Sequence, residues 1–463
     1  MFIPALLLPH QNLDPVAKYF LVRFVLRFGI VAPVQCGVKE LAKMIGVSDR
    51  LVTKSLADLV GHGLLSHQAV SEGRGRPKSE YRCTPSFVAM LSEFSSSLSS
   101  PQKTVIAHLL ERAALGDGRG RSLSGAADVA VFQDKMTPAE RLANLRARKK
   151  SDRLSNTNRL LLAVLLTRAD RFGVVSDFGS SELRKATGLS QERLRCGIDR
   201  LLNLGLIRAY VPGATSSVFF KKTKSVYFLN LHSPEMLSPK APAVLVSVEQ
   251  NPQDNCVWDQ ATFILESISA VPEQSFFKVR GFFVRKQERR LIYLLRSRLE
   301  CYASYLLTHH WNELLIDGYH EGLLQLIKDD FPSGKRVASS DFPTDEHYSS
   351  LAQYLHNEAN WVARLIQGSL VAAEFPALKL EAMDYVALPK SIASRHSTEG
   401  QRTSVAVLAF AREPGVVCAG YHVATMSEGR KIIHRHFTCA EEISKEDRYF
   451  FGLQTSPGAA LVR

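Results

Sequence analysis

Residues 38–65 read VKELAKMIGVSDRLVTKSLADLVGHGLL. The stretch from Val38 to Ile45 is expected to form a short helix that ends at Gly46, because glycine readily adopts the left-handed conformation that closes many helices. Ser48 is then the N-cap of a second helix, since its hydroxyl can accept an unpaired backbone N–H of the first turn. This pattern predicts two helices joined by a tight turn.

The second helix has one apolar face. Val52, Leu56 and Leu59 repeat at helical spacing, which predicts that this face is buried. Gly63 ends the helix, and a strand begins at Leu64. Helix, tight turn, helix and strand follow one another as in a helix-turn-helix, whose second helix presents its polar side outward.

The same pattern occurs again 142 residues later, without a gap, in residues 180–207, SSELRKATGLSQERLRCGIDRLLNLGLI. Gly188 aligns with Gly46 and Ser190 with Ser48. The other positions align in the same register: Leu183 with Leu41, Leu194 with Val52, Ile198 with Leu56, Leu201 with Leu59, Gly205 with Gly63 and Leu206 with Leu64. The helix caps, the turn glycine, the buried positions and the glycine that ends the second helix all align. The sequence therefore predicts that the same unit occurs twice in one chain.

Each copy has similar flanks. An amphipathic helix is expected before each one, over residues 15–30 and 158–172. A strand, a tip and a returning strand are expected after each one, over residues 64–85 and 206–231, where Gly and Pro interrupt the apolar residues. These are the flanks that a winged helix needs.

With these flanks the chain resembles the winged helix-turn-helix transcriptional regulators of bacteria, in the branch that includes the MarR-like and related proteins. The resemblance is carried by IGVSDRLVTKSLADLVGHGLL (45–65) and by GRGRPKSEYRCT (73–84), and it covers about residues 15–90 and 156–231. It implies sequence-specific binding of double-stranded DNA and a role in transcription regulation. The expected fold is mainly α with small β wings: two winged-helix domains followed by a helical α+β C-terminal domain.

Four regions are expected along the chain. A first winged-helix DNA-binding domain takes residues 1–95, and a second takes 155–235. Between them, 96–154 is expected to be a flexible linker, Gly/Ser-rich at 116–128, with a basic helix that begins at the cap residue Thr137. Residues 236–463 are expected to form a C-terminal domain that is helical over 255–375 and ends in a small sheet from about 378. The strands of this sheet are expected at 378–389, 403–412, 415–426 and 430–439.

The charge of the chain favours a polyanion as partner. Residues 1–232 contain 34 Lys/Arg against 18 Asp/Glu, a net charge of +16, whereas the remainder has 24 against 27, a net charge of −3. The excess of positive charge therefore lies entirely in the half with the repeated unit, as expected if that half binds nucleic acid.

Other features of the composition predict a cytoplasmic protein. Its seven cysteines are widely spaced without a C-x-x-C pair, which argues against a zinc ribbon or a disulfide framework and fits a reducing compartment. The opening MFIPALLLPH lacks the basic start of a signal peptide. No run of about 18 apolar residues occurs, so no membrane span is expected.

The N-terminal residues of a recognition helix lie nearest the base edges of the major groove. In the first copy Arg50 is the best candidate for reading a base, because a guanidinium can pair with guanine O6 and N7. Thr53 and Lys54 are candidates for base or phosphate contacts. In the second copy the candidates are Gln191, Arg193 and Arg195, of which Gln suits adenine and Arg suits guanine. A plain solvated helix face is the alternative for each of them.

The two predicted wings differ in charge. Arg74 and Arg76, between glycines at the first tip, are expected to reach a minor groove, and Lys78 to lie nearer a phosphate. The second tip, PGATSS (212–217), is neutral. Its cations follow on the returning strand and are expected to contact only the DNA backbone: Lys221, Lys222 and Lys224. The first module is therefore expected to supply more of the sequence specificity.

Two stretches of the sequence resemble enzyme motifs but lack a residue that each motif requires. HEGLL (320–324) has Leu324 where a zincin needs its second His, and SGKR (333–336) lacks the first P-loop glycine. His309, His310, His434 and His436 lack the i, i+4 spacing of a helical metal pair. The protein is therefore expected not to be an enzyme, and no catalytic residue, metal site or cofactor is predicted.

Three functions remain open on sequence alone. The leading hypothesis is a transcriptional regulator that binds double-stranded DNA, forms a homodimer through its C-terminal half, and reaches two half-sites roughly one helical turn or a multiple apart. A replication initiator of a plasmid or mobile element is the second. The third is an enzyme or assembly protein that uses the two modules for docking.

Overall fold

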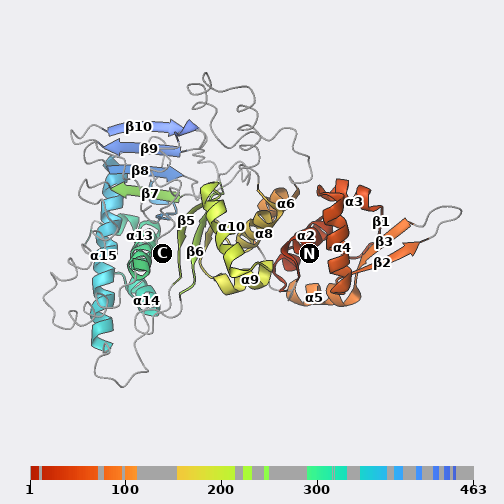
Figure 1. Cartoon of the computed structure of the whole chain (residues 1–463). Coiled ribbons are helices and arrows are strands. Elements are labelled where there is room, and N and C mark those ends of the chain that lie inside the picture. Colours follow the sequence, from red (N-terminus) through yellow and green to blue (C-terminus); the bar gives the residue numbers. More distant parts are fainter. Residues whose placement is uncertain are drawn as a thin grey trace. The chain divides into compact units, whose positions relative to one another are not determined.

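A computed structural model describes the protein in the following ranges: residues 2–9, 13–70, 78–95, 100–111, 154–213, 223–231, 244–249, 289–314, 316, 319–330, 345–372, 380–388, 403–408, 421–426, 432–437 and 442–444. These residues are mainly helical, with small antiparallel sheets (Figure 1). The chain divides into two compact units, Met1–Leu206 with Ser233–Ser238, and Ile207–His232 with Pro239–Arg463.

The first unit begins with two helices, α1 (Phe2–Leu7) and α2 (Pro15–Phe28). Asp14 caps α2, because its carboxylate accepts the Val16 N–H at 2.9 Å and Pro15 supplies the fixed φ of a first helical position. The aromatic and aliphatic residues of α2 are almost entirely buried, so this helix forms the centre of the unit.

After the short strand β1 (Val34–Gln35), the pair of helices predicted at residues 38–65 follows as α3 (Val38–Ile45) and α4 (Asp49–Gly61). Gly46 ends α3 with φ 72° and ψ 41°, in the left-handed region that glycine accepts without strain. The Ser48 hydroxyl accepts the Leu51 N–H at the start of α4. The predicted apolar face of α4 is buried, as expected: Val52, Leu56 and Leu59.

Two strands and a helix complete this part of the unit: β2 (Leu65–Val70), β3 (Lys78–Cys83) and α5 (Pro85–Ser95). β2 and β3 pair antiparallel from Leu65↔Cys83 to Val70↔Lys78, and β1 lies on the other side of β3, which makes the strand order β1-β3-β2. In Figure 1, β2 and β3 are the two long arrows beside α4. The connection 71–77 joins the far ends of this ladder and lies outside the described residues.

The region expected to be a flexible linker contains a packed helix. α6 (Lys103–Glu111) buries Val105, Ile106, Leu109 and Leu110. Just before it, Ser100 Oγ donates to the Leu166 carbonyl at 3.3 Å and Gln102 Nε2 donates to the Asp170 carbonyl at 3.0 Å. Residues 100–111 are thus part of the core of the first unit. The basic helix predicted from Thr137 lies outside the described residues.

The second copy has its elements in the same chain order: α8 (Asn156–Thr167), β4 (Val174–Val175), α9 (Ser180–Thr187) and α10 (Gln191–Asn203). The bounds of α9 and α10 are those of α3 and α4 moved by 142 residues, as the sequence predicts. The Ser190 hydroxyl accepts the Arg193 N–H, and Gly188 has φ 72°.

Helix α8 is shorter than the helix predicted over 158–172. It ends at Thr167, because Asp170 then organises a turn in which its carboxylate accepts the N–H groups of Phe172 and Val174, both at 2.8 Å. A carboxylate that bonds backbone N–H groups in this way competes with helix continuation. This local competition is not visible in the spacing of apolar residues on which the prediction rested.

The second unit contains two sets of strands. β5 (Ile207–Val211) and β6 (Val226–Leu229) pair antiparallel, with a bulge between Ile207 and Ala209. A separate four-stranded antiparallel sheet has the order β10-β9-β8-β7. Its strands are β7 (Val244–Glu249), β8 (Thr403–Leu408), β9 (Tyr421–Met426) and β10 (Ile432–Phe437).

This sheet matches the sequence prediction only in part. The strands expected in 403–412, 415–426 and 430–439 are present, whereas the sequence did not indicate β7. The strand expected over 378–389 is wrong in its described part, 380–388, which begins with the 3-10 turn η3 (Leu380–Ala382).

The helical elements described in the second unit are α13 (Arg289–His309), the 3-10 turn η2 (Trp311–Glu313), α14 (Glu321–Asp330) and α15 (Asp345–Ala372). α13 packs along α15, and Figure 1 draws α15 as one long continuous helix. The Tyr302 hydroxyl of α13 donates to Asp330 Oδ2 of α14 at 2.7 Å. Among the helices that the structure describes, none combines the length and the apolar composition needed to cross a bilayer.

Candidate nucleic-acid interface

The polar side of α4 presents the three residues that the sequence singled out in the first copy. Arg50, Thr53 and Lys54 are all exposed. Arg50 makes no hydrogen bond or ion pair with another residue that the structure describes, whereas Thr53 Oγ1 donates within the helix to the Asp49 carbonyl at 3.1 Å. Arg50 is therefore the side chain on this face whose donors are available to a ligand.

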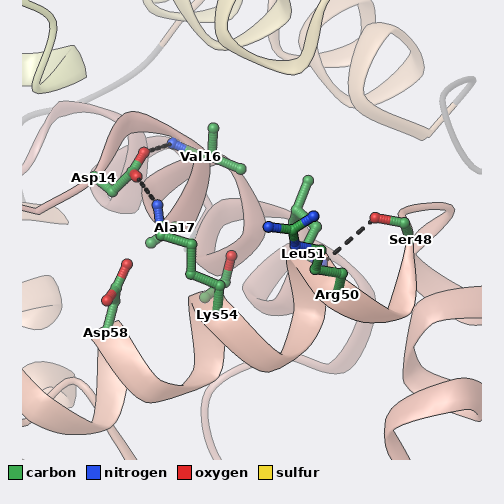
Figure 2. A pocket seen from close by; sticks show the side chains of 9 residues that line it. Asp14, Val16, Ala17, Ser48, Arg50, Leu51, Lys54 and Asp58 are labelled. Carbon is green, nitrogen blue, oxygen red and sulfur yellow. Dashed lines mark hydrogen bonds and ion pairs between the residues drawn. The ribbon is translucent and has the colours of Figure 1, made fainter.

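Lys54 is engaged by a residue that the sequence reasoning missed. Its Nζ lies 2.7 Å from Asp14 Oδ2, and the side chains of Lys54 and Asp14 are 67% and 29% exposed (Figure 2). Burial raises the pKa of the Asp14 carboxyl, but the bonds from Lys54 and from the Val16 N–H hold it below its usual value. The same bond raises the pKa of Lys54. Both groups are thus charged at neutral pH, and Lys54 already has an anionic partner.

Asp14 and Lys54 lie on the wall of a shallow pocket between the start of α2 and the exposed side of α4. The pocket has a volume of about 250 Å³, and Arg50, Ser48 and Asp58 also line it. Figure 2 shows the Arg50 guanidinium and the Asp14–Lys54 pair along the same stretch of α4. The spacing of Arg50 and Lys54 by one helical turn explains why both reach this surface.

The second copy packs against the first at the start of α2. Gly188, in the turn between α9 and α10, lies so close to the first copy that a Cβ added to it would be 2.7 Å from the Leu13 carbonyl oxygen. Residues Leu13 and Pro15, which the added Cβ would meet, flank Asp14. The turn of the second helix pair therefore sits beside the residue that binds Lys54.

The exposed Arg193 lies in the first turn of α10, which begins three residues after Gly188, and its charge lowers the pKa of both Asp14 and Lys54. We call Arg50, Lys54 and Arg193 the basic face. Its members come from both copies, and the acidic group Asp14 lies among them.

The other residues predicted to contact DNA lie on α10, at β3 and before β6, or outside the described residues. Gln191 and Arg195 are exposed on α10, while Leu194 between them is buried. Lys78 is exposed at the start of β3, and Lys224 is exposed just before β6 in the second unit. Four residues lie outside the described residues: Arg74, Arg76, Lys221 and Lys222.

We expect Gly188→Ala to lower the free energy of unfolding by about 1–3 kcal/mol more than Gly63→Ala does. Both glycines have positive φ, 72° and 66°, so alanine costs about 1–2 kcal/mol at either position. Only at Gly188 does the added Cβ also meet a backbone oxygen of the other copy, because no described atom lies within 4 Å at Gly63. Urea unfolding of the full chain, followed by circular dichroism, measures both costs. Equal losses would show that this contact does not hold the two copies together.

No protein-family model matches the chain, and no curated protein matches its sequence.

Proposed function

We propose that each copy is a winged helix-turn-helix and that the chain binds double-stranded DNA sequence-specifically as a cytoplasmic transcriptional regulator. The observation that carries the proposal is the basic face: an exposed arginine without a described partner in the first turn of α4, Lys54 one helical turn further on, and the exposed Arg193 in the first turn of α10. An exposed guanidinium at the start of a helix suits recognition of guanine in the major groove.

The members of the basic face have different roles in this proposal. Arg50 reads a base, because its donors have no described partner in the protein. Arg193 and Lys54 contact phosphates and set the position of the protein on the duplex. Lys54 contributes less to DNA affinity than a lysine without a partner would. Its ammonium group lies 2.7 Å from the Asp14 carboxylate, and a phosphate contact must weaken or break this ion pair.

The packing of Gly188 on Leu13 gives the proposal a geometric consequence, since it holds the second helix pair against the first copy. In this proposal α4 and α10 bind one stretch of duplex together. The four cysteines that the structure describes have free thiols, which supports a reducing compartment for this activity.

The test is a selection of bound sequences from a pool of random duplexes, followed by affinity measurements on the selected site and on an unrelated duplex. Arg50→Ala should weaken binding to the selected site by about 1–3 kcal/mol and leave the unrelated duplex nearly unchanged, because it removes a base contact. Fluorescence anisotropy at fixed salt measures both affinities.

Two variants serve as controls for the loss of one positive charge. Lys54→Ala should weaken both duplexes equally, and by less than a typical phosphate contact, because Asp14 already offsets its charge. Lys103→Ala removes an exposed cation from α6 and should change neither affinity by more than a few tenths of a kcal/mol. Equal losses on all duplexes for Arg50→Ala would make Arg50 a phosphate contact, and absence of duplex binding at low salt contradicts the proposed function.

A further inference from the structure

Three ligand-type side chains converge where α13 ends and α14 begins. His310 follows α13 directly, Glu313 closes η2, and His320 precedes the first residue of α14. One nitrogen or oxygen atom from each of them lies within 4.8 Å of the others. The intervals of three and seven residues match no helical metal motif, so the sequence did not indicate this group.

The separations suit a single small cation. His310 Nδ1 lies 2.8 Å from Glu313 Oε2, and His320 Nδ1 lies 4.0 Å from the same oxygen. A tetrahedral ion with bonds of about 2.1 Å holds its ligand atoms roughly 3.4 Å apart, a value between these two distances. The two imidazole rings are adjacent, with centroids 4.3 Å apart. Small side-chain rotations are thus enough to close the set around one ion.

The surrounding helix α15 holds the group in place. His356 Nε2 accepts the backbone N–H of His320 at 3.1 Å, and Gln367 Nε2 donates to the Trp311 carbonyl at 2.7 Å. The first bond fixes the start of α14, and the second fixes the turn that carries His310 and Glu313. Because a metal site needs ligands that are oriented before the ion arrives, this second layer of bonds favours binding.

The His320 imidazole is buried and incompletely hydrogen-bonded. Its residue is 7% exposed, and its buried Nε2 makes no hydrogen bond among the described residues. A buried polar atom without a partner is uncommon in native structures and calls for an explanation.

We propose that His310, Glu313 and His320 bind one divalent transition-metal ion, with Zn²⁺ as the best-suited ion. Two imidazole nitrogens and one carboxylate oxygen form an established type of zinc ligand set, whereas Ca²⁺ and Mg²⁺ favour oxygen ligands. A water molecule occupies the remaining position. The ion ties the end of α13 to the start of α14, and this role is independent of DNA binding.

The test is a titration of the full chain, freed of metal by a chelator, with Zn²⁺. Trp311 lies between two of the ligands, and the chain has only three tryptophans, so tryptophan fluorescence should change and saturate at one Zn²⁺ per chain. Equilibrium dialysis with elemental analysis counts the bound ion directly. Mg²⁺ at the same concentration should produce neither signal.

Two variants separate a metal site from a buried histidine with a structural role. Glu313→Gln removes one ligand from a side chain that is 62% exposed, so the fold should persist while Zn²⁺ affinity falls at least about tenfold. His309→Gln changes the neighbouring histidine outside the group and should keep one tight Zn²⁺. Failure of the wild-type chain to bind Zn²⁺, or equal affinity in the wild-type and Glu313→Gln chains, would overturn the proposal.

Discussion

Raising the salt concentration from 50 to 200 mM should weaken the binding of this chain to its selected duplex by about 10³-fold to 10⁵-fold. That range corresponds to six to ten neutralised phosphates, each of which releases condensed counterions when a cation of the protein replaces them. Residues 1–232 have a net charge of +16, enough to supply such contacts. The slope of log K against log salt, measured by fluorescence anisotropy, reports the number of contacts.

Asp14→Asn is the matched variant for this measurement. Asn also caps helices, so α2 keeps its first-turn bond, while Lys54 loses the carboxylate that lies 2.7 Å away. The variant should bind all duplexes more tightly, because Lys54 no longer has an anionic partner in the protein. The slope of log K against log salt should become steeper by the amount that corresponds to about one additional phosphate contact. A slope near zero in the wild-type chain would contradict the proposed function. An unchanged slope in the variant would remove Lys54 from the basic face.

The stability of the protein should rise by about 3 kcal/mol between pH 7.5 and pH 10 through one buried lysine. Lys18 is 2% exposed, and its Nζ donates to the Leu8 carbonyl at 2.7 Å. Burial lowers the pKa of Lys18 to about 7, whereas the unfolded chain keeps the ordinary value of 10.5. The unfolded state therefore binds more protons over this interval. The stability from neutral Lys18 is full above the unfolded pKa and is lost as the pH falls towards 7.

Lys18→Met tests the assignment, because methionine has a similar length and does not titrate. Urea unfolding of both chains, followed by circular dichroism at several pH values, isolates the lysine from the other groups that titrate near pH 10. The variant should be more stable than the wild type at pH 7, and the difference should shrink towards pH 10. If the free energies of unfolding of the two chains change with pH in parallel, Lys18 does not titrate in this range.

The helix pairs were the most predictable part of the molecule. Ser48, Gly46 and Gly63, with their counterparts 142 residues later, define each helix end through bonds within a few residues. Such signals need no knowledge of the rest of the fold. The prediction is less accurate where a local bond competes with the helix, as at Asp170. It is also less accurate in the C-terminal half, where the patterns are weaker and the strand predicted at 378–389 is wrong.

The candidate site was predicted residue by residue but not as an arrangement. The exposure of Arg50, Thr53 and Lys54 follows from the burial of the opposite face of α4. The ion pair of Lys54 could not be predicted in this way, because Asp14 lies 40 residues away in the sequence and looks like an ordinary helix cap. The sequence reasoning treated Lys54 as an uncommitted cation, and only the packing of α2 on α4 revealed its ion pair.

The sequence by itself determined where the helices of the two repeated pairs start and end, that this pair occurs twice, and that the excess positive charge belongs to that half. Each of these depends on neighbours within a few turns or on a sum over residues. The tertiary structure alone decided the meeting of Gly188 with Leu13, the ion pair of Lys54, and the convergence of His310, Glu313 and His320. These contacts join side chains by packing between helices, and no local pattern encodes which buried faces will meet.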